Sequence, residues 1–304
     1  MYYIFYIPLY LLSLLPMWVL YIFSDGVYLL LYHVTGYRKK TVLDNLRLAF
    51  PLKTEAERIV IAKQFYRNLI DSFIETLKSL SASRKFLGKR VLANWEVLEP
   101  VQKSGRNCQL HLGHTFNWEW GHQVLSGFTR YQVLVVYMPI TNPVFEKLMY
   151  RLRIKYGNRF IAAGNMGKYM ASIGQTQYLL GLVADQSPGN LANAYWMNFF
   201  GHPTPFVSGP EKGARAGNLP VFFTSITKPR RGHYLAHIEL ACENPSSLPE
   251  GELTRRYAAY MEQVITKNPE MWLWSHRRWK HAWNPQYSNN WIGQQGPPSV
   301  QGQS

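Results

Sequence analysis

Apolar residues along the chain change their spacing from region to region, and this spacing predicts the order of helices and strands. Between residues 38 and 80 the apolar positions recur every three or four residues, which is typical of helices with one packed face. Pro51 divides the region, so two helices are expected there. The second carries an apolar stripe at four-residue spacing that we expect to pack in the core: Phe65, Leu69, Phe73 and Leu77.

From residue 107 onward, short apolar runs alternate with amphipathic segments. The runs predict strands over 107–112, 131–137, 159–163, 178–184, 220–226 and 233–240. The segments between and after them predict helices over 118–125, 144–156, 166–173, 210–216 and 253–266. Such alternation favours an α/β fold with a mixed, mostly parallel sheet flanked by helices. Active sites in these sheets gather beyond the carboxyl ends of the strands.

The first 24 residues carry no charged side chain and are long enough to cross a bilayer. They show neither the basic leader nor the small-residue cleavage site of a signal peptide. Pro8 and Pro16 favour a kinked or partly interfacial helix, and a buried core helix is the alternative. We therefore expect a transmembrane or interfacial anchor over 1–24, a single α/β domain over 25–292, and a disordered tail rich in Gly, Gln, Pro and Ser over 293–304.

The formal net charge of +15, from 33 Lys and Arg against 18 Asp and Glu, implies an anionic partner. Phospholipid headgroups, an acidic carrier protein, a phosphorylated substrate and nucleic acid all satisfy that requirement. The apolar N-terminal segment favours the membrane over nucleic acid. Basic residues follow this segment closely, and their position places the domain on the cytoplasmic side: Arg38, Lys39, Lys40 and Arg47.

Candidate chemistry lies at the end of the first predicted strand of the alternating region. Gly113 permits a turn, His114 follows it, and Glu119 comes five residues later. Residues five apart on one helix are rotated by roughly 140°, so this pair can meet only if His114 lies in the turn and Glu119 in the next helix. Thr115 or Asn117 can cap that helix. An imidazole supported by a carboxylate in such a turn can act as a general base toward a hydroxyl.

Other interpretations of these residues remain open. His114 and Glu119 are equally consistent with a structural hydrogen-bonded pair. A zinc site is a second alternative, with ligands drawn from His111, His114, Glu119 and His122, although no Cys pair or second His cluster completes a recognisable spacing. Only two cysteines are present, so no disulfide framework is implied. Cys108 is expected to be a small buried strand residue rather than a catalytic thiol.

A second polar cluster ends another apolar run, where Asp185 and Gln186 precede a Gly- and Asn-containing loop. If that strand lies next to the strand of His114, Asp185 projects into the same cleft and can orient the imidazole. A loop-capping aspartate is the alternative. Arg151 and Arg153 on a predicted helix are either a solvated face or a phosphate-binding pair.

Taken together, these segments resemble the late acyltransferases of lipid A biosynthesis and related bacterial glycolipid acyltransferases. The similarity is ordered from about Tyr37 to Lys280. It comprises the basic segment 37–51, the helix 65–75, the His-x4-Asp/Glu signature at 114–119, the 142–157 section with its Arg-x-Arg, the Asp-Gln loop at 184–188, and the motifs 199–201, 209–212 and 272–280.

The resemblance implies a glycerolphosphate acyltransferase-like fold with an N-terminal membrane-anchoring helix, and transfer of an acyl chain from a thioester on acyl carrier protein to a hydroxyl of a lipid A precursor. His114 is then the general base, supported by Glu119 and Asp185. No covalent acyl-enzyme, cofactor or metal is implied. Further residues implied to bind the substrate are Arg151, Arg153, Gln186, Lys212 and Arg215. Expected partners are acyl carrier protein, a membrane glycolipid acceptor and inner-membrane phospholipids, without nucleic acid.

Two other functions fit the same features. The acceptor can be another bacterial lipid, such as a lysophospholipid, an aminolipid, a different glycolipid or a polyene pigment. The protein can also be a non-catalytic membrane protein that binds acyl carriers. Trp272 and Trp274 are equally consistent with a core and a substrate role, and Arg277 and Arg278 with a solvated edge.

Overall fold

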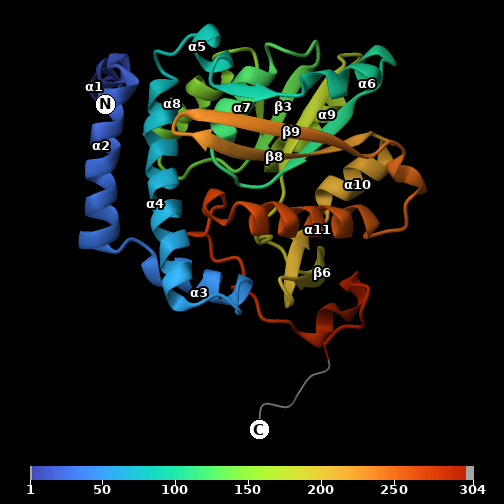
Figure 1. Ribbon diagram of the computed structural model, residues 1–304. Coiled ribbons are helices and arrows are strands. Elements are labelled where there is room, and N and C mark those ends of the chain that lie inside the picture. The colour runs from blue at the N-terminus through green and yellow to red at the C-terminus, as the bar shows by residue number, and fades with distance from the viewer. Residues whose placement is uncertain (1, 299–304) are drawn as a thin grey trace.

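A computed structural model describes residues 2–298 (Figure 1). Its centre is a seven-stranded sheet in the order β1-β9-β8-β2-β5-β3-β4. All neighbouring strands in it run parallel except β8 and β9, which form an antiparallel hairpin. Helices flank this sheet, and a separate antiparallel pair, β6 and β7, lies apart from it. The predicted α/β fold with a mixed, mostly parallel sheet is confirmed.

The elements have the following bounds. The strands are β1 Val91–Ala93, β2 Cys108–Leu112, β3 Gln132–Tyr137, β4 Arg159–Ala162, β5 Tyr178–Val183, β6 Ala194–Phe199, β7 His202–Val207, β8 Val221–Arg230 and β9 His233–Cys242. The α-helices are α1 Tyr2–Leu14, α2 Met17–Leu29, α3 Lys39–Ala49, α4 Glu55–Lys78, α5 Arg84–Gly88, α6 Glu99–Lys103, α7 Trp118–Leu125, α8 Pro143–Ile154, α9 Met166–Ser172, α10 Gly209–Ala216 and α11 Glu252–Lys267. A π-helical stretch, Leu30–Thr35, continues α2.

The six strands expected from apolar runs are all present, and the helices expected between them begin and end within a few residues of their predicted bounds. Three strands were not predicted: β1, β6 and β7. β1 has only three residues, and its Leu92 is exposed, so it leaves no apolar run. β7 carries Pro203 and Pro205, which are typical of turns and edges rather than of a strand interior. Its pairing with β6 compensates for the weak pattern.

The apolar N-terminal segment consists of two helices rather than one. α1 ends at Leu14 and α2 begins at Met17, with Pro16 as the residue that precedes the first turn. A proline cannot donate the backbone hydrogen bond that would continue α1, so the chain changes direction there. The only stretch in residues 2–298 that is long and apolar enough to cross a membrane is Met17–Thr35, which extends beyond the predicted boundary at residue 24.

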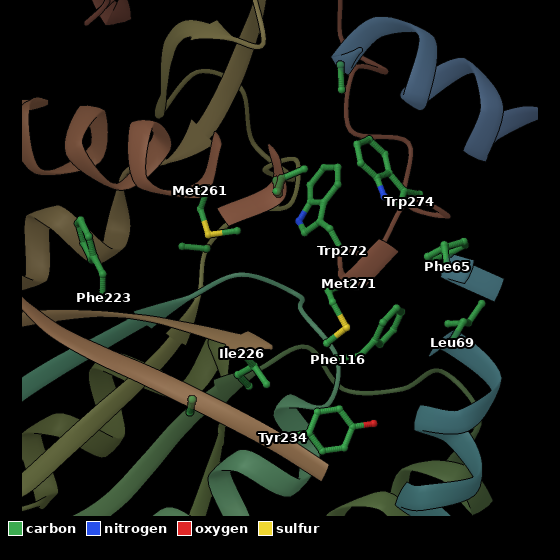
Figure 2. Packing of buried hydrophobic residues seen from close by; sticks show 14 of the residues in the cluster. Phe65, Leu69, Phe116, Phe223, Ile226, Tyr234, Met261, Met271, Trp272 and Trp274 are labelled. Atoms are coloured by element: carbon green, nitrogen blue, oxygen red, sulfur yellow. The ribbon is translucent and has the colours of Figure 1, made fainter. Parts of the chain in front are cut away.

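The main core joins segments that are far apart in the sequence (Figure 2). Phe65 and Leu69 of α4 lie there with Phe116, which follows the strand β2, and with Met271 and Trp272 near the C-terminus. The predicted stripe on α4 is only partly correct, because Phe73 is 63% exposed. Residues four apart drift by about 40° around a helix, which moves Phe73 away from the face of Phe65 and Leu69, while Leu77 is partly buried.

The end of the chain falls partly outside the described region. Residues 293–298 form neither helix nor strand. Residues 299–304 lie beyond the described residues, so the disorder predicted for this tail remains a prediction.

Candidate active site

His114 and Asp185 meet because the strands that precede them are neighbours. β2 and β5 pair in parallel, with Leu112 opposite Val183 at their carboxyl ends. The next residues remain in register, since the Ala184 N–H donates to the Leu112 carbonyl over 3.2 Å. Two loops therefore leave the same edge of the sheet side by side, and each carries one polar side chain into the shared space.

The His114 imidazole is held directly by the Asp185 carboxylate. Nδ1 of His114 lies 2.5 Å from Oδ1 of Asp185, and the His114 backbone N–H donates to Oδ2 over 2.8 Å. The Asp185 side chain is 1% exposed and that of His114 is 22% exposed. Within residues 2–298, Nε2 of His114 has no hydrogen-bond partner. The ring is thus anchored on one nitrogen and accessible on the other.

Trp272 supplies a further donor to the same carboxylate. Its indole Nε1–H donates to Oδ2 of Asp185 over 2.6 Å, and the side chain is buried. Burial opposes ionisation of Asp185, but the nearby His114 and the hydrogen bonds from His114 and Trp272 outweigh it and hold the pKa of Asp185 below its ordinary value. Asp185 is therefore a carboxylate at neutral pH, as it must be to support a cationic imidazole.

Gly113 is favoured by close packing rather than by its backbone conformation. It is not among the residues of positive φ. A Cβ at this position would lie 2.2 Å from Cε of Met261 and 3.0 Å from Oδ2 of Asp185. The absent side chain lets the loop approach Asp185 closely enough for the backbone hydrogen bond of His114. The sequence suggested glycine here for a sharp turn, and the structure shows a different reason.

Glu119 does not contact His114, contrary to the expected pairing. As predicted, it lies in the first turn of α7, where the Asn117 side chain caps the helix by accepting from the Trp120 N–H. Its carboxylate instead binds Arg153 of α8, with Oε1 2.5 Å from Nη2, and lies 3.3 Å from Nε2 of His122. The short sequence separation favoured Glu119, but the helix directs its side chain toward α8.

In the buried cluster of Glu119, His122 and Arg153, the carboxylate of Glu119 is paired with the Arg153 guanidinium. Burial opposes ionisation of Glu119, but His122 and Arg153 outweigh it and keep the pKa of Glu119 below its ordinary value. Burial also lowers the pKa of His122, whose Nδ1 lies 2.8 Å from the Asn158 side-chain amide. The Arg153 guanidinium, predicted to bind substrate, is thus largely engaged by Glu119 and buried between α7 and α8.

The loop between His114 and α7 is attached to the rest of the fold at two points. The Phe116 N–H donates to the Met271 carbonyl over 3.0 Å. Asn117 donates from Nδ2 to Oε2 of the fully buried Glu75 over 2.9 Å. Glu75 also accepts from the hydroxyl groups of Tyr21 and Tyr234. The loop is consequently supported by α4 on one side and by the C-terminal segment on the other.

An apolar pocket opens beside this loop, between α7 and the sheet. Its cavity volume is about 50 Å³, within about 550 Å³ of atom-free space that includes open solvent. Leu112, Trp118 and His122, which are close to His114 in the sequence, are among its lining residues. Further lining comes from α7, the sheet and the turn before α6, and includes Leu125, Val133, Val135, Gly181, Ile238 and Trp95. Its lining is almost entirely apolar, which suits a hydrocarbon chain and not a sugar or a phosphate.

The remaining predicted substrate-binding residues are not gathered at His114. Arg151 lies on α8, with its guanidinium over the ring of Tyr2. Lys212 and Arg215 are on α10, which packs beside Gln109 at the opposite end of β2 from Gly113. Gln186 follows Asp185 and is half-buried. Arg278, interpreted as a solvated edge, is instead completely buried over the ring of Phe206, whereas its neighbour Arg277 is exposed as expected.

The residues considered for a metal or a thiol nucleophile have other surroundings. In the described part of the chain, no three His, Cys, Asp or Glu side chains converge to hold a metal ion. His111 lies in β2 with Nε2 2.7 Å from the Gln109 side chain, and burial lowers its pKa to about 3. Burial raises the pKa of Cys108 to about 12, so this residue is a buried thiol at neutral pH.

The C-terminal segment fastens the Asp185 loop from outside. The Ser187 N–H donates to Nε2 of His276, and its hydroxyl donates to the Arg278 carbonyl. Asn45 of α3 holds the same segment through the carbonyl groups of Trp274 and His276. Sequence reasoning gave Trp272 no role at Asp185. The aromatic repeat at 272–274 was the available signal, but it could not reveal what the indole N–H faces.

Comparison with known proteins is consistent with this arrangement. The sequence profile described as bacterial lipid A biosynthesis acyltransferase matches residues 1–281. The lipid A biosynthesis palmitoleoyltransferase of Escherichia coli K12 is 23% identical over 251 residues, which cover 80% of this chain and 79% of the relative. The lipid A biosynthesis acyltransferase of Shigella flexneri matches with the same identity and coverage.

Proposed function

Because the chain belongs to the bacterial lipid A biosynthesis acyltransferase family, we propose that it moves a fatty acyl chain from an acyl-carrier-protein thioester to a hydroxyl of a lipid A precursor, with His114 as general base. Family membership makes the chain an acyltransferase with a lipid acceptor. The observation that carries the finer proposal is the His114 imidazole held through Nδ1 by buried Asp185 while Nε2 stays accessible.

In the proposed reaction, Nε2 of His114 accepts the proton of the acceptor hydroxyl while the oxygen attacks the thioester carbonyl. The new C–O bond forms, the C–S bond breaks, and the proton passes from the imidazolium to the departing thiolate. Asp185 stabilises the imidazolium, because its carboxylate contacts Nδ1 directly. The raised pKa of buried Cys108 is consistent with direct transfer without an acyl-enzyme.

The apolar pocket beside His114 is the proposed site of the donor acyl chain. Its lining begins at Leu112 and Trp118, which flank the loop of His114 in the sequence. A thioester carbonyl at the mouth of the pocket would therefore lie next to the imidazole, with the hydrocarbon extending beneath α7. Burial of methylene groups gives about 0.8 kcal/mol each, so the pocket also provides affinity for the donor.

The proposed location is the cytoplasmic face of the inner membrane. Exposed basic residues follow the apolar helices, and Lys40 is an example with a side chain 89% exposed. The net charge of +15 suits both an acidic carrier protein and anionic phospholipids. Arg151 remains our candidate for a phosphate contact because it is exposed on α8, whereas Arg153 is engaged by Glu119.

The direct test is acyl transfer by the detergent-purified protein, with acyl-carrier thioester and lipid A precursor as substrates. His114→Ala should lose transfer by a factor of about 10² to 10⁴, and His237→Ala, on an exposed imidazole of β9, should retain it. Transfer by the His114 variant at the wild-type rate would refute the assignment. Parallel reactions with acyl-coenzyme A or with lysophospholipid acceptors would show whether donor and acceptor are as proposed.

A further inference from the structure

The helix α2 packs one face against α4 and turns many of its large apolar side chains outward. Its buried positions recur every three or four residues along the contact with α4: Met17, Leu20, Ser24, Tyr28 and, in the π-helical continuation, Tyr32. The opposite face exposes bulky apolar residues, including Trp18 at 68%, Ile22 at 63% and Val34 at 75%. The exposed face of a soluble helix is normally polar, whereas Asp25, paired with Arg231, is the charged residue within this apolar outer face. The outer face therefore suits an apolar environment.

The centre of the same stretch is tied to charged groups of the domain. Asp25 lies near the middle of Met17–Thr35 and accepts from Arg231 at the tip of the β8–β9 hairpin over 2.7 Å. Arg231 also binds Asp71 of α4, which in turn accepts from Ser24 of α2 over 2.7 Å. Lys228 of the same hairpin lies 3.0 Å from Asp71.

The hairpin tip is shaped to fit against α2. Gly232 has a φ of +72°, and a Cβ there would lie 2.1 Å from the Tyr21 hydroxyl. Only glycine satisfies both the positive φ and this close approach. Tyr21 in turn donates to Glu75, the residue that holds Asn117 of the active-site loop. The packing of α2 is therefore specific, and hydrogen bonds connect it through Glu75 to the loop that carries His114.

A docked α2 is incompatible with a membrane-spanning α2. The stretch of 19 residues is about 28 Å long, which matches a hydrocarbon core of about 30 Å. If it crossed the bilayer as packed, the hairpin tip and the charged α4 would lie at the depth of the lipid tails. Charged side chains are strongly disfavoured at that depth, and an open hairpin end cannot satisfy its backbone there.

Helix α1 presents a second apolar face and is also fixed to the domain. Nζ of Lys78 binds the carbonyl groups of Ser13 and Leu15 at its end, and Lys147 and Arg151 of α8 lie over Tyr2 at its start. Exposed apolar residues cover much of this helix: Tyr3, Ile4, Phe5, Ile7, Leu11 and Leu14. In Figure 1, α1 is viewed nearly end-on and α2 from the side, at the same edge of the molecule.

We propose that α1 and α2 form a monotopic anchor that lies in the plane of one leaflet, with both its ends and the whole domain on the same side of the membrane. Two helices that run in different directions define a plane, and their apolar faces would sink into the headgroup and acyl boundary. Lys147, Arg151 and Lys40 are placed to meet anionic headgroups. This inference rests on the membrane association proposed above.

Side-specific labelling distinguishes the two topologies. In a Cys242→Ser background, where Cys108 is buried, one variant carries a Gly-Ser leader with a single cysteine before Met1, and another carries Lys40→Cys on the domain. A membrane-impermeant maleimide should label both only in inverted vesicles. Labelling of the leader from the opposite side to Lys40→Cys would establish a spanning helix and overturn the proposal, as would recovery of the protein in the soluble fraction.

Vesicle binding tests the apolar face itself. The Trp18→Ser, Ile22→Ser double variant should bind phosphatidylethanolamine–phosphatidylglycerol vesicles about 100-fold more weakly, as expected for two large side chains withdrawn from lipid. Leu240→Ser is the matched control, because Leu240 is 45% exposed but lies toward the far end of β9 from the hairpin tip. Equal vesicle binding by the double variant and the control would show that the outer face of α2 does not contact lipid. If the wild-type protein shows the expected maleimide labelling but no acyl transfer, the proposed reaction is refuted and the monotopic anchor is not.

Discussion

Substitution of Asp185 by asparagine should disable the base while leaving the site assembled. Asparagine has the same shape, but it offers one acceptor oxygen and one NH2 donor where aspartate offers two acceptors. In the wild type, Oδ2 accepts from Trp272 Nε1 and the His114 N–H, and Oδ1 faces Nδ1 of His114. The asparagine oxygen can therefore face either the two N–H donors of Trp272 and His114 or Nδ1 of His114, but not both.

The structure determines that choice. An NH2 group turned toward Trp272 and the His114 N–H would oppose two buried donors, each at about 1–3 kcal/mol. The oxygen therefore stays on those donors and the NH2 group faces Nδ1 of His114. Nδ1 becomes the acceptor, and the imidazole proton moves to Nε2. That tautomer cannot accept the proton of an acceptor hydroxyl, so the contribution of the general base, about 10² to 10⁴ in rate, is lost.

The assay is kcat for acyl transfer at saturating donor and acceptor, with KM measured in parallel. Asp185→Asn should lower kcat by that factor and leave KM within about threefold, because the pocket and the acceptor side are unchanged. Asp44→Asn is the control, since Asp44 is an exposed carboxylate paired with Lys40. A kcat above about one third of wild type in a folded Asp185→Asn protein would refute the reasoning.

Four further predictions follow from the same geometry. Trp272→Phe removes one hydrogen bond to an ionised carboxylate, about 1.5–3 kcal/mol, and should lower kcat at least about tenfold, whereas an unchanged kcat in the folded protein would contradict a positioning role. Glu119→Gln leaves Arg153 buried without its anion and should cost about 3–5 kcal/mol in urea unfolding; the Glu119→Gln, Arg153→Met double variant should recover part of this, and no recovery would count against the pairing. Because the pKa of Asp185 lies below its ordinary 3.8, its ionisation stabilises the fold above that pH, so the unfolding free-energy gap between wild type and Asp185→Asn should shrink as the pH falls below 3.8; a gap that grows below that pH would reverse the sign. Gly181→Val projects into the apolar pocket, where a Cβ alone finds ordinary contact distances of 3.5 Å and more, and should shift donor preference toward shorter acyl chains in competition assays, a result that an unchanged product profile would exclude.

The strands and most helices were predictable because each depends on a local apolar pattern. The position of His114 was predictable for the same reason, since it follows the run that becomes β2. Its partner was harder to predict. Glu119 is close in sequence, but the contact belongs to Asp185, 71 positions away, and depends on the pairing of β2 with β5. No residue near His114 indicates which strand is its neighbour.

The sequence was least informative where an element serves two purposes. Trp272 is buried in the core and also donates to Asp185. Its large apolar side chain predicts the first role, but nothing in the sequence predicts the second. Arg278 carries a charge that normally indicates the surface, yet it is completely buried. The first 24 residues indicated a membrane partner through their apolarity. Pro16 indicated a kink, but the docking of α2 onto α4 and the hairpin depends on contacts between distant segments that the sequence does not show.

The fastening of the Asp185 loop by residues 272–278 has a consequence for biosynthesis. Trp272, His276 and Arg278 follow the residues they bind by 87 to 91 positions, and they complete the support of the proposed catalytic pair. A nascent chain in which residues 272–278 are still inside the ribosomal exit tunnel lacks this support. Products that terminate before Trp272 would thus carry the apolar helices without the groups that hold the proposed base in place.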